Sequence, residues 1–247
     1  MRLSSLDVSR NTELYDLSCG YNLIRHLDIS NNAKLKYFYC YNNPIKKVTF
    51  ANCPNISTLW IQKCQLLYVD LSMLANLKDL SEGHLGSQQR SMPVVLLPEG
   101  WGIAITQNMD LSLVSDLMFD GKPCKVKGTT AKGRRYLIVS AATCDESEVV
   151  GKKVTYNYDT RAVTDTHLMD VTVTLSEKGT ARPLGDVNND GNASLADLME
   201  IVSQILNPST DNEADLDEMD INDDCNVSIN DVMQLVDIIL EKDSTQP

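Results

Sequence analysis

Apolar residues in the first third of the chain recur with a step of 21 residues. Four columns share this register: Leu3, Ile24, Ile45 and Leu66; Leu6, Leu27, Val48 and Val69; Leu14, Leu35, Ile56 and Leu77; and Leu17, Phe38, Leu59 and Leu80. A turn of this length cannot bury its apolar face alone, so neighbouring turns must stack and form the core between them. The pattern predicts a short solenoid over residues 1–90.

Beyond residue 90 the period is lost, and short runs that alternate apolar with polar residues follow. The predicted strands are Val94–Leu97, Gly102–Thr106, Leu113–Met118, Lys125–Lys127, Tyr136–Ser140, Val154–Tyr158 and Val171–Leu175. Turn residues such as Asp120-Gly121-Lys122-Pro123 separate them. So many short strands in so short a segment predict an all-β, sandwich-like middle domain over residues 91–180.

The last segment, residues 181–247, shows helical periodicity in two places. One apolar stripe is formed by Leu195, Leu198, Ile201, Val202 and Ile205, and the other by Val232, Leu235, Val236 and Ile239. Spacings of three and four residues place such side chains on one face of a helix. We therefore expect two amphipathic helices here.

The residues that alternate with the buried columns of the solenoid must face its concave surface. They are Asp16, Ser18 and Gly20, then Tyr37, Tyr39 and Tyr41, then Thr58, Trp60 and Gln62. Tyr37, Tyr39, Tyr41 and Trp60 would form an exposed aromatic patch, which is typical of surfaces that bind a protein or glycan. The alternative is that strand propensity and cross-strand stacking alone favour aromatic residues at these positions.

The first third resembles the leucine-rich repeat family. The pattern L-x-x-L-x-L-x-x-N/C-x-L is met from Leu14 to Ile24, from Leu35 to Ile45 and from Ile56 to Leu66, with Asn22, Asn43 and Cys64 at the N/C position. The resemblance covers roughly residues 1–86. The asparagine amides can pair backbone groups that tight turns leave unsatisfied. We expect Cys19 and Cys40 to be small buried thiols rather than a metal pair or a disulfide.

The loop from Asp186 to Asp197 carries oxygen-bearing side chains at alternate positions. Asp186, Asn188, Asp190, Ser194 and Asp197 stand at loop positions 1, 3, 5, 9 and 12, Gly191 stands at position 6, and Asn192 at position 7 offers its carbonyl. Calcium takes six to eight oxygen ligands, and residues two apart on a tightly turning loop can converge on one ion. The sequence predicts an EF-hand-like calcium-binding loop.

A second copy starts 34 residues later, with Asp220, Asn222, Asp224, Asn226, Ser228 and Asp231 at the same positions. Cys225 takes the position of the glycine, where a positive φ is needed and a side chain is unfavourable. We therefore predict a second calcium site that is weaker than the first. The alternative for both copies is an acidic turn that binds no metal.

The pair of loop–helix units resembles a dockerin type I module, a family with duplicated calcium loops and aspartate at position 12. The segment from Gly185 to Gly191 matches its opening signature, and the resemblance covers about residues 184–242. It implies calcium-dependent docking to a cohesin-like partner through loop positions 10 and 11, here Leu195, Ala196, Ile229 and Asn230. The Ser-Thr pair found at these positions in cellulose-degrading complexes is absent, so the identity of the partner stays open.

Charge supports a cation site and disfavours other ligands. The chain has 34 acidic and 22 basic residues and a net charge of −12, which makes nucleic acid and anionic membrane surfaces poor partners. The acidic excess lies in the C-terminal segment, where Lys242 is the only basic residue between Asp186 and Asp243. There is no apolar stretch of about 18 residues for a membrane span and no visible signal peptide.

The chain carries no catalytic motif. Neither G-x-S-x-G nor H-E-x-x-H nor a glycine-rich phosphate loop is present. A carboxylate pair for glycoside hydrolysis meets only in space, so the sequence leaves that possibility open. A disulfide between Cys124 and Cys144 also stays open, since an exported protein would permit it.

The predicted fold class is therefore multidomain: a short leucine-rich-repeat solenoid, a sandwich-like all-β domain, and an all-α calcium-loop dockerin-like C-terminal domain. The predicted function is non-enzymatic: an extracellular or cell-surface bacterial protein for recognition or cell adhesion through protein–protein or glycan contacts, attached by its C-terminal segment. The alternative is an ancillary C-terminal part of a larger secreted polysaccharide-degrading enzyme.

Overall fold

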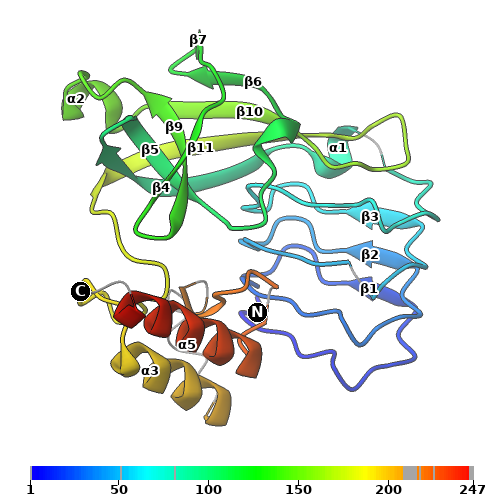
Figure 1. Ribbon diagram of the computed structural model, residues 1–247. Coiled ribbons are helices and arrows are strands. Elements are labelled where there is room, and N and C mark those ends of the chain that lie inside the picture. Colours follow the sequence, from blue (N-terminus) through cyan, green and yellow to red (C-terminus); the bar gives the residue numbers. More distant parts are fainter. Residues whose placement is uncertain are drawn as a thin grey trace.

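Three parts of the molecule are visible in Figure 1: a solenoid of stacked turns, a broad curved sheet above it, and a pair of helices beneath the sheet and beside the solenoid. The structure is a computed structural model. It describes residues 2–50, 52–80, 82–207, 216, 218–224 and 226–244, without the side chains of residues 82 and 242–244.

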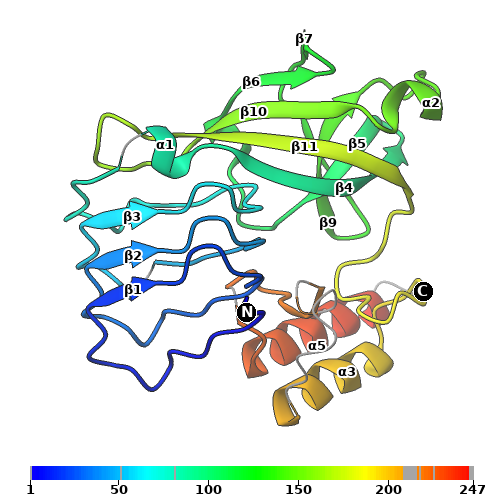
Figure 2. The same cartoon turned by 180° about the vertical axis from the view of Figure 1, so that it is seen from behind.

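Short parallel strands form the face of the solenoid: β1 (Asp16–Ser18), β2 (Tyr37–Tyr39) and β3 (Thr58–Trp60). Each residue pairs with the one 21 positions further on, as Leu17 does with Phe38. The next turn adds an isolated bridge between Thr58 and Asp79. Figure 2 shows the strands one above another. The step found in the sequence is thus the step of the stacked strands.

Asparagine amides inside the solenoid pair the backbone groups of adjacent turns. Asn43 Nδ2 donates to the carbonyls of Cys19 (2.9 Å) and Cys40 (2.8 Å), and its Oδ1 accepts from the Ile24 N–H (3.0 Å). A second column contains Asn32, which donates to the carbonyls of Val8 and Asn11. Buried polar backbone groups cost free energy when they are unpaired, so these amides hold the turns together.

Cysteines continue both asparagine columns one turn later. Cys64 Sγ donates to the Cys40 carbonyl (3.6 Å), and Cys53 Sγ donates to the Ile29 carbonyl (3.2 Å). Cys19 and Cys40 are buried free thiols, which confirms the prediction for them. Burial raises the pKa of Cys19 and of Cys53 to about 11, so both thiols stay protonated at neutral pH.

The middle of the chain is one mixed sheet of eight strands in the order β7-β6-β10-β11-β4-β5-β9-β8. The strands are β4 (Gln88–Leu97), β5 (Gly100–Ile105), β6 (Val114–Phe119), β7 (Lys122–Pro123), β8 (Gly128–Ala131), β9 (Arg134–Ser140), β10 (Lys153–Asp159) and β11 (Leu168–Gly179). β11 and β4 are parallel, and the other neighbours are antiparallel. The 3₁₀ turn Leu111–Leu113 and the short helices α1 (Glu82–Leu85) and α2 (Glu146–Val149) lie between strands.

The prediction of a β-sandwich is wrong. The strands belong to a single curved sheet, and the predicted strand Lys125–Lys127 has no strand conformation. Alternation along a strand shows that one face is buried, but it does not show what buries it. Here the sheet curls, and its inner face packs against the end of the solenoid instead of against a second sheet.

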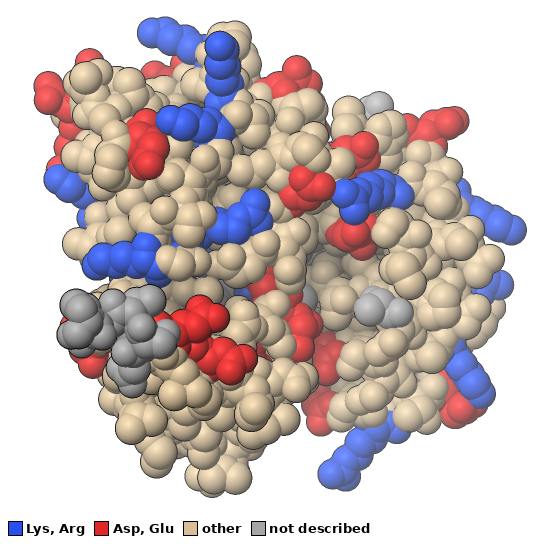
Figure 3. Space-filling view, in the orientation of Figure 1, with Lys and Arg blue, Asp and Glu red and all other residues tan. Residues whose placement is uncertain are grey.

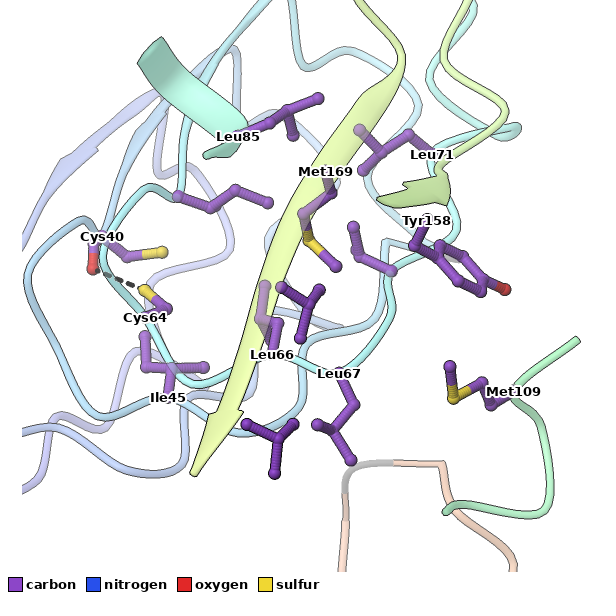
Figure 4. Close-up of a cluster of buried hydrophobic side chains, with 14 of the residues drawn as sticks. Cys40, Ile45, Cys64, Leu66, Leu67, Leu71, Leu85, Met109, Tyr158 and Met169 are labelled. Carbon is purple, nitrogen blue, oxygen red and sulfur yellow. Dashed lines mark hydrogen bonds between the residues drawn. The ribbon is translucent and has the colours of Figure 1, made fainter. Parts of the chain in front are cut away.

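The solenoid and the sheet share one hydrophobic core. They therefore pack as a single unit and not as two separate layers. Figure 4 shows Leu66 and Leu67 of the solenoid beside Met169 of β11 and Tyr158 of β10. The Tyr156 hydroxyl on β10 donates to the Leu67 carbonyl at 2.8 Å.

Gln88, the first residue of β4, makes the joint between the solenoid and the sheet. Its Nε2 donates to the carbonyls of Ile61 (2.8 Å) and Leu85 (2.9 Å), and its Oε1 accepts from the Leu66 N–H (3.3 Å). These bonds repeat the pattern of Asn43 at the end of the array. Gln88 also pairs with Val171 of β11, so the last turn of the solenoid runs directly into the sheet.

The C-terminal segment forms the helices α3 (Leu195–Leu206) and α5 (Ile229–Ser244). Ile201 of α3 and Leu235 of α5 are fully buried together with Val187 and Ile221 of the preceding loops. Leu195 was expected in the buried stripe, but it is one of the exposed residues of α3.

The predicted fold class is also wrong at this end of the chain, where it placed an all-α calcium-loop dockerin-like domain. Among the described residues, α1, α2, α3 and α5 have 4, 4, 12 and 16 residues, and the larger architecture is sheet. The loop before α5 lies against the solenoid and β9 through ion pairs to Lys47 and Arg134, so the two helices are not an independent unit. Helical periodicity cannot reveal such contacts, because they are made by the loops.

Candidate functional site

The predicted aromatic residues lie together on the strand face of the solenoid. The Tyr39 and Trp60 rings meet edge to face with centroids 5.1 Å apart, and Tyr41 lies 5.9 Å from Trp60. Tyr37, Tyr39, Tyr41 and Trp60 are all half-buried, because each ring covers part of its neighbour and leaves the rest open to solvent. We call this set the aromatic face.

Other rings extend the aromatic face and were not recognised in the sequence. Tyr15 contacts Tyr37 at 5.5 Å, Tyr21 contacts Tyr41 at 5.2 Å, and the His84 ring stacks on Trp60 at 4.4 Å. Tyr15 and Tyr21 lie on either side of β1 and are out of phase with Asp16, Ser18 and Gly20, so the alternation along the strand gave no signal for them. His84 follows the point where the 21-residue step fades, so periodicity gave no signal for it.

Glycine at position 20 makes room for one of these rings. A side chain there would place its Cβ only 2.9 Å from the ring of Tyr41. The other predicted concave residues, Asp16 and Ser18, are exposed and give the first turn a polar surface beside the rings.

The first oxygen-rich loop, residues 186–197, is held by its own backbone. Asp186 accepts the N–H groups of Asp190 (3.0 Å) and Gly191 (3.1 Å), while Asn188 and Asp190 each accept an N–H two residues on. Positive φ values at Asn189 (62°) and Gly191 (97°) bend the chain tightly. The acceptors therefore lie on the inside of the bend.

Asp197 closes this loop from the first turn of α3. Its Oδ1 accepts the N–H of Val187 (2.7 Å) and its Oδ2 accepts both the N–H (2.9 Å) and the hydroxyl (3.0 Å) of Ser194. Asp186 and Asp197 are 0% exposed. Of the described cationic groups, Arg182 forms the ion pair with Asp186, with Nε 4.0 Å from Oδ2.

The donor set of the first loop fits calcium. Its oxygens are hard ligands from carboxylate, amide and hydroxyl groups, and of its two buried carboxylates Asp186 alone has an ion-pair partner among the described residues, Arg182. Asp186, Asn188, Asp190, Ser194, Asp197 and the carbonyl of Asn192 would hold the ion. No three His, Cys, Asp or Glu side chains converge as a metal-binding group within the described ranges. The fit therefore depends on the amide and hydroxyl oxygens as well as on the carboxylates.

The second loop, residues 220–231, repeats the same bonds. Asp224 N donates to Asp220 Oδ1 (3.0 Å) and to Asn222 Oδ1 (2.9 Å), Asn226 N donates to Asp224 (3.0 Å), and Ser228 N donates to Asp231 (2.8 Å). Asp223 has the positive φ (63°) that Asn189 has in the first loop. Cys225, predicted to be a misfit at position 6, lies outside the described residues.

A lysine of the solenoid enters the second loop. Lys47 Nζ lies 3.0 Å from Asp220 Oδ2 and 2.6 Å from Asp223 Oδ1, and the three side chains are 12%, 5% and 3% exposed. Burial alone would lower the pKa of Lys47, but Asp223 and Asp220 outweigh it and raise that pKa. Burial raises the pKa of Asp220 to about 6, although Lys47 opposes the shift. The second loop thus contains its own cation and fits calcium less well than the first.

Further contacts fix the second loop to the rest of the molecule. The Tyr68 hydroxyl donates to Asp223 (3.3 Å), Asn108 Nδ2 donates to the carbonyls of Asn222 and Asp223, and Arg134 pairs with Glu218. Figure 3 shows acidic residues gathered where the segment of α3 and α5 meets the solenoid. The second loop is therefore an internal contact as well as a candidate metal site.

The predicted partner-binding residues Leu195, Ala196, Ile229 and Asn230 are exposed, and further apolar side chains of both helices are exposed near them. Leu195, Met199 and Leu206 on α3 and Ile229, Met233 and Leu240 on α5 are between 59% and 71% exposed. Each residue of one set stands 34 positions from its counterpart, so the duplication extends to these apolar triads. Ala196 and Asn230 are exposed beside them. Large exposed apolar side chains in such number are typical of a protein-binding surface.

Cys124 and Cys144, left open as a disulfide, are free thiols. The Cys124 Sγ donates to the Val139 carbonyl (3.6 Å), and the Ser140 hydroxyl donates to Cys144 Sγ (3.2 Å). None of the helices in the described ranges combines the length and apolar character that crossing a bilayer requires.

Comparisons with known proteins give a distant structural likeness. No protein-family model and no curated protein matches the chain. Among solved structures, it is similar to the functional domain of InlJ from Listeria monocytogenes, which includes a cysteine ladder, at 21% identity and a TM-score of 0.41. The match covers 71% of this chain but 36% of that one, so this chain spans about a third of the length of that structure. A likeness this distant carries no argument about function.

Proposed function

We propose that this protein is a non-enzymatic, extracellular recognition or adhesion protein that binds a protein or glycan on the aromatic face. The observation that carries the proposal is the continuous contact of Tyr39, Tyr41, Trp60 and His84 on the open strand face. Rigid aromatic side chains supply large contact area at low entropic cost and dominate the energetics of many interfaces.

Stacking alone does not account for the polar atoms of this face. The indole Nε1 of Trp60 and the amide Oε1 of Gln62 are inaccessible to solvent and have no hydrogen-bond partner. Buried donors and acceptors are nearly always paired, and an indole N–H in a purely structural stack would be expected to find an acceptor. A ligand could pair these atoms only after a side chain of the aromatic face moved to expose them, with an acceptor for Trp60 Nε1 and a donor for Gln62 Oε1.

The C-terminal segment would attach the protein to its surroundings. Here the proposal rests on the first loop, whose donors fit calcium, on the resemblance of the paired loops to dockerin type I, and on the exposed triads of α3 and α5. Calcium at the first loop would fix the start of α3 and so present Leu195, Ala196 and Met199. Ile229 and Asn230 would present the equivalent surface of the second copy. The partner would be a cohesin-like protein or another cell-surface component.

Replacing Tyr39 and Trp60 together by alanine tests the recognition surface. We expect the double variant to lose at least about 2 kcal/mol of binding free energy, roughly thirtyfold in affinity, for any ligand found on a panel of immobilised glycans and extracellular proteins. The matched control replaces the exposed residues Leu96 and Val163 of the sheet segment by alanine. Equal binding by the double variant and the wild type would exclude the aromatic face.

Docking is tested separately on immobilised cohesin domains. We expect binding with calcium present, loss of binding in excess chelator, and loss of binding by Asp186→Asn at saturating calcium. The Leu195→Ser and Met199→Ser double variant should fold normally and bind weakly. Binding that ignores both chelator and the apolar substitutions would contradict this half of the proposal.

A further inference from the structure

A groove runs along the rim of the solenoid, at the amino ends of its strands, and adjoins the aromatic face at Tyr15. Tyr15, Lys36, Ser57 and Lys78 line it, and they stand 21 residues apart. The backbone N–H of each of the last three donates to the carbonyl of the residue one turn before, at 2.9 Å in every case. The groove has a volume of about 490 Å³. Backbone hydrogen bonds between successive turns thus hold the lining residues in place, as they hold the strands.

A second column, two residues before the first on each turn, completes the groove with polar groups. Asn55 and Asn76 use their Nδ2 groups on the carbonyls of Ala33 (2.9 Å) and Pro54 (3.1 Å), which leaves the amide oxygens as acceptors. Lys34, beside them, pairs with Glu13 at 2.5 Å. The groove therefore offers cations, fixed amide oxygens and a serine hydroxyl at regular spacing.

Part of the positive charge of this groove is left unpaired by the described residues. Lys36 and Lys78 form no ion pair with any carboxylate among the described residues. Lys36 Nζ instead lies over two rings, 5.5 Å from the centre of Tyr15 and 5.4 Å from that of Tyr37. Interaction with Tyr15 raises the pKa of Lys36, so the ammonium is kept. Figure 3 shows basic side chains spaced down the right-hand edge of the solenoid, in a chain whose net charge is −12.

We propose that the rim groove binds the carboxylate or sulfate groups of an acidic polysaccharide that also contacts the aromatic face. This inference rests on the proposed function and narrows its ligand. Tyr37 belongs to the aromatic face and touches Tyr15 of the groove, so the two surfaces are continuous. A sugar stacked on Tyr37 would hold an acidic substituent within reach of Lys36.

A polysaccharide suits the groove better than other polyanions. Its repeating units match a surface that places Lys36, Ser57 and Lys78 on successive turns, and its ring faces can stack on Tyr15 and Tyr37. An acidic peptide would engage the lysines, but it would not use the ordered amide oxygens and rings.

The test measures binding of heparin and polygalacturonate, with dextran as a neutral polysaccharide and poly-glutamate as an acidic peptide. The full chain is compared with a Lys36→Gln, Lys78→Gln variant and with a Lys125→Gln, Lys127→Gln control, which removes equal charge from exposed positions of the sheet segment. We expect the rim variant to bind both acidic polysaccharides about tenfold more weakly or worse, and the control to bind them normally. Added salt should weaken wild-type binding.

Three results would overturn the inference. They are equal binding by the rim variant and the wild type, equal loss in the control, and binding of poly-glutamate as strong as that of the polysaccharides. If the acidic polysaccharides fail to bind while another ligand still requires Tyr39 and Trp60, this inference fails and the proposed function stands. If ligands bind equally well to the Tyr39→Ala, Trp60→Ala variant, the proposed function fails.

Discussion

The two oxygen-rich loops carry the same residues at the six predicted ligand positions, 34 positions apart, and make similar internal hydrogen bonds, yet their surroundings differ. In the first loop, the cation nearest Asp186 is Arg182 at 4.0 Å. In the second, Lys47 reaches Asp220 at 3.0 Å and Asp223 at 2.6 Å from a different part of the fold. Local sequence therefore determines the shape of each loop, while distant residues determine what balances its charge.

This difference in surroundings gives each copy of the duplicated loop a different role. The first loop, whose donor types fit calcium, leads directly into α3. The second loop fastens the C-terminal segment to the solenoid through Lys47 and Tyr68, and to the sheet segment through Asn108. Changes that act on one loop and spare the other can separate these tasks.

The largest effect is expected from Lys47→Met, which removes the cation of the second loop. Losing one partner of a buried ion pair leaves uncompensated charge, and we expect the free energy of unfolding to fall by about 3–5 kcal/mol. Denaturant titration measures this loss. The control is Lys152→Met, since Lys152 pairs with Asp120 at an exposed position and should cost less than about 1 kcal/mol.

Calcium sharpens the result for Lys47→Met. If the lysine stands in for a metal ion, saturating calcium should restore part of the stability of Lys47→Met and add a second ion to the binding stoichiometry. If the variant were as stable as the wild type in chelator, Lys47 would not stabilise the contact between the second loop and the solenoid.

The second effect is calcium binding at the first loop of the unaltered chain. Titration calorimetry after removal of metal should give one tight site, and calcium at 100 times its dissociation constant should raise the free energy of unfolding by about 2.7 kcal/mol. Asp186→Asn with Asp197→Asn should abolish both signals, while Asp220→Asn should leave the tight site intact. Two equal sites in the wild type would refute the distinction between the loops.

A smaller effect is expected at loop position 4, where Asn189 and Asp223 share a positive φ but differ in charge. Asp223→Asn removes one of the two carboxylates around Lys47 and should cost about 1.5 kcal/mol. The reciprocal Asn189→Asp has no lysine to meet and should change stability by less. Equal effects of the two substitutions in thermal melts would mean that contact with Lys47 does not make the two loops differ in their contribution to stability.

The smallest effect on stability is expected at the apolar triads. Leu195→Ser with Met199→Ser, or Ile229→Ser with Met233→Ser, should change the free energy of unfolding by less than about 0.5 kcal/mol, since these side chains are exposed. Their effect on docking should be large for whichever copy the partner contacts. A large loss of stability would indicate a structural role for the triads instead.

The sequence predicted features that depend on neighbouring positions or on one repeated step. The stacked strands, most strands of the sheet, and the oxygen positions of both loops are of this kind. The aromatic face was predicted in its centre, since Tyr37, Tyr39 and Trp60 follow the alternation of β2 and β3.

Features that depend on long-range contact were missed. Lys47 meets Asp220 across 173 positions, and nothing in the pattern around either residue indicates the partner. The single curved sheet was mistaken for a sandwich because alternation does not identify the layer that covers a face. Gln88 was missed because it takes over the role of the asparagine amides three residues out of step with the array.

That offset glutamine has a consequence for the length of the binding surface. Because the side chain of Gln88 bonds to the last two turns, and earlier turns bond to their neighbours through similar amides, whole turns could be added or removed upstream of these two without altering the junction with β4. Relatives or engineered forms could thus present a longer or shorter row of rings on an unchanged support, with ligand size scaling with the number of turns.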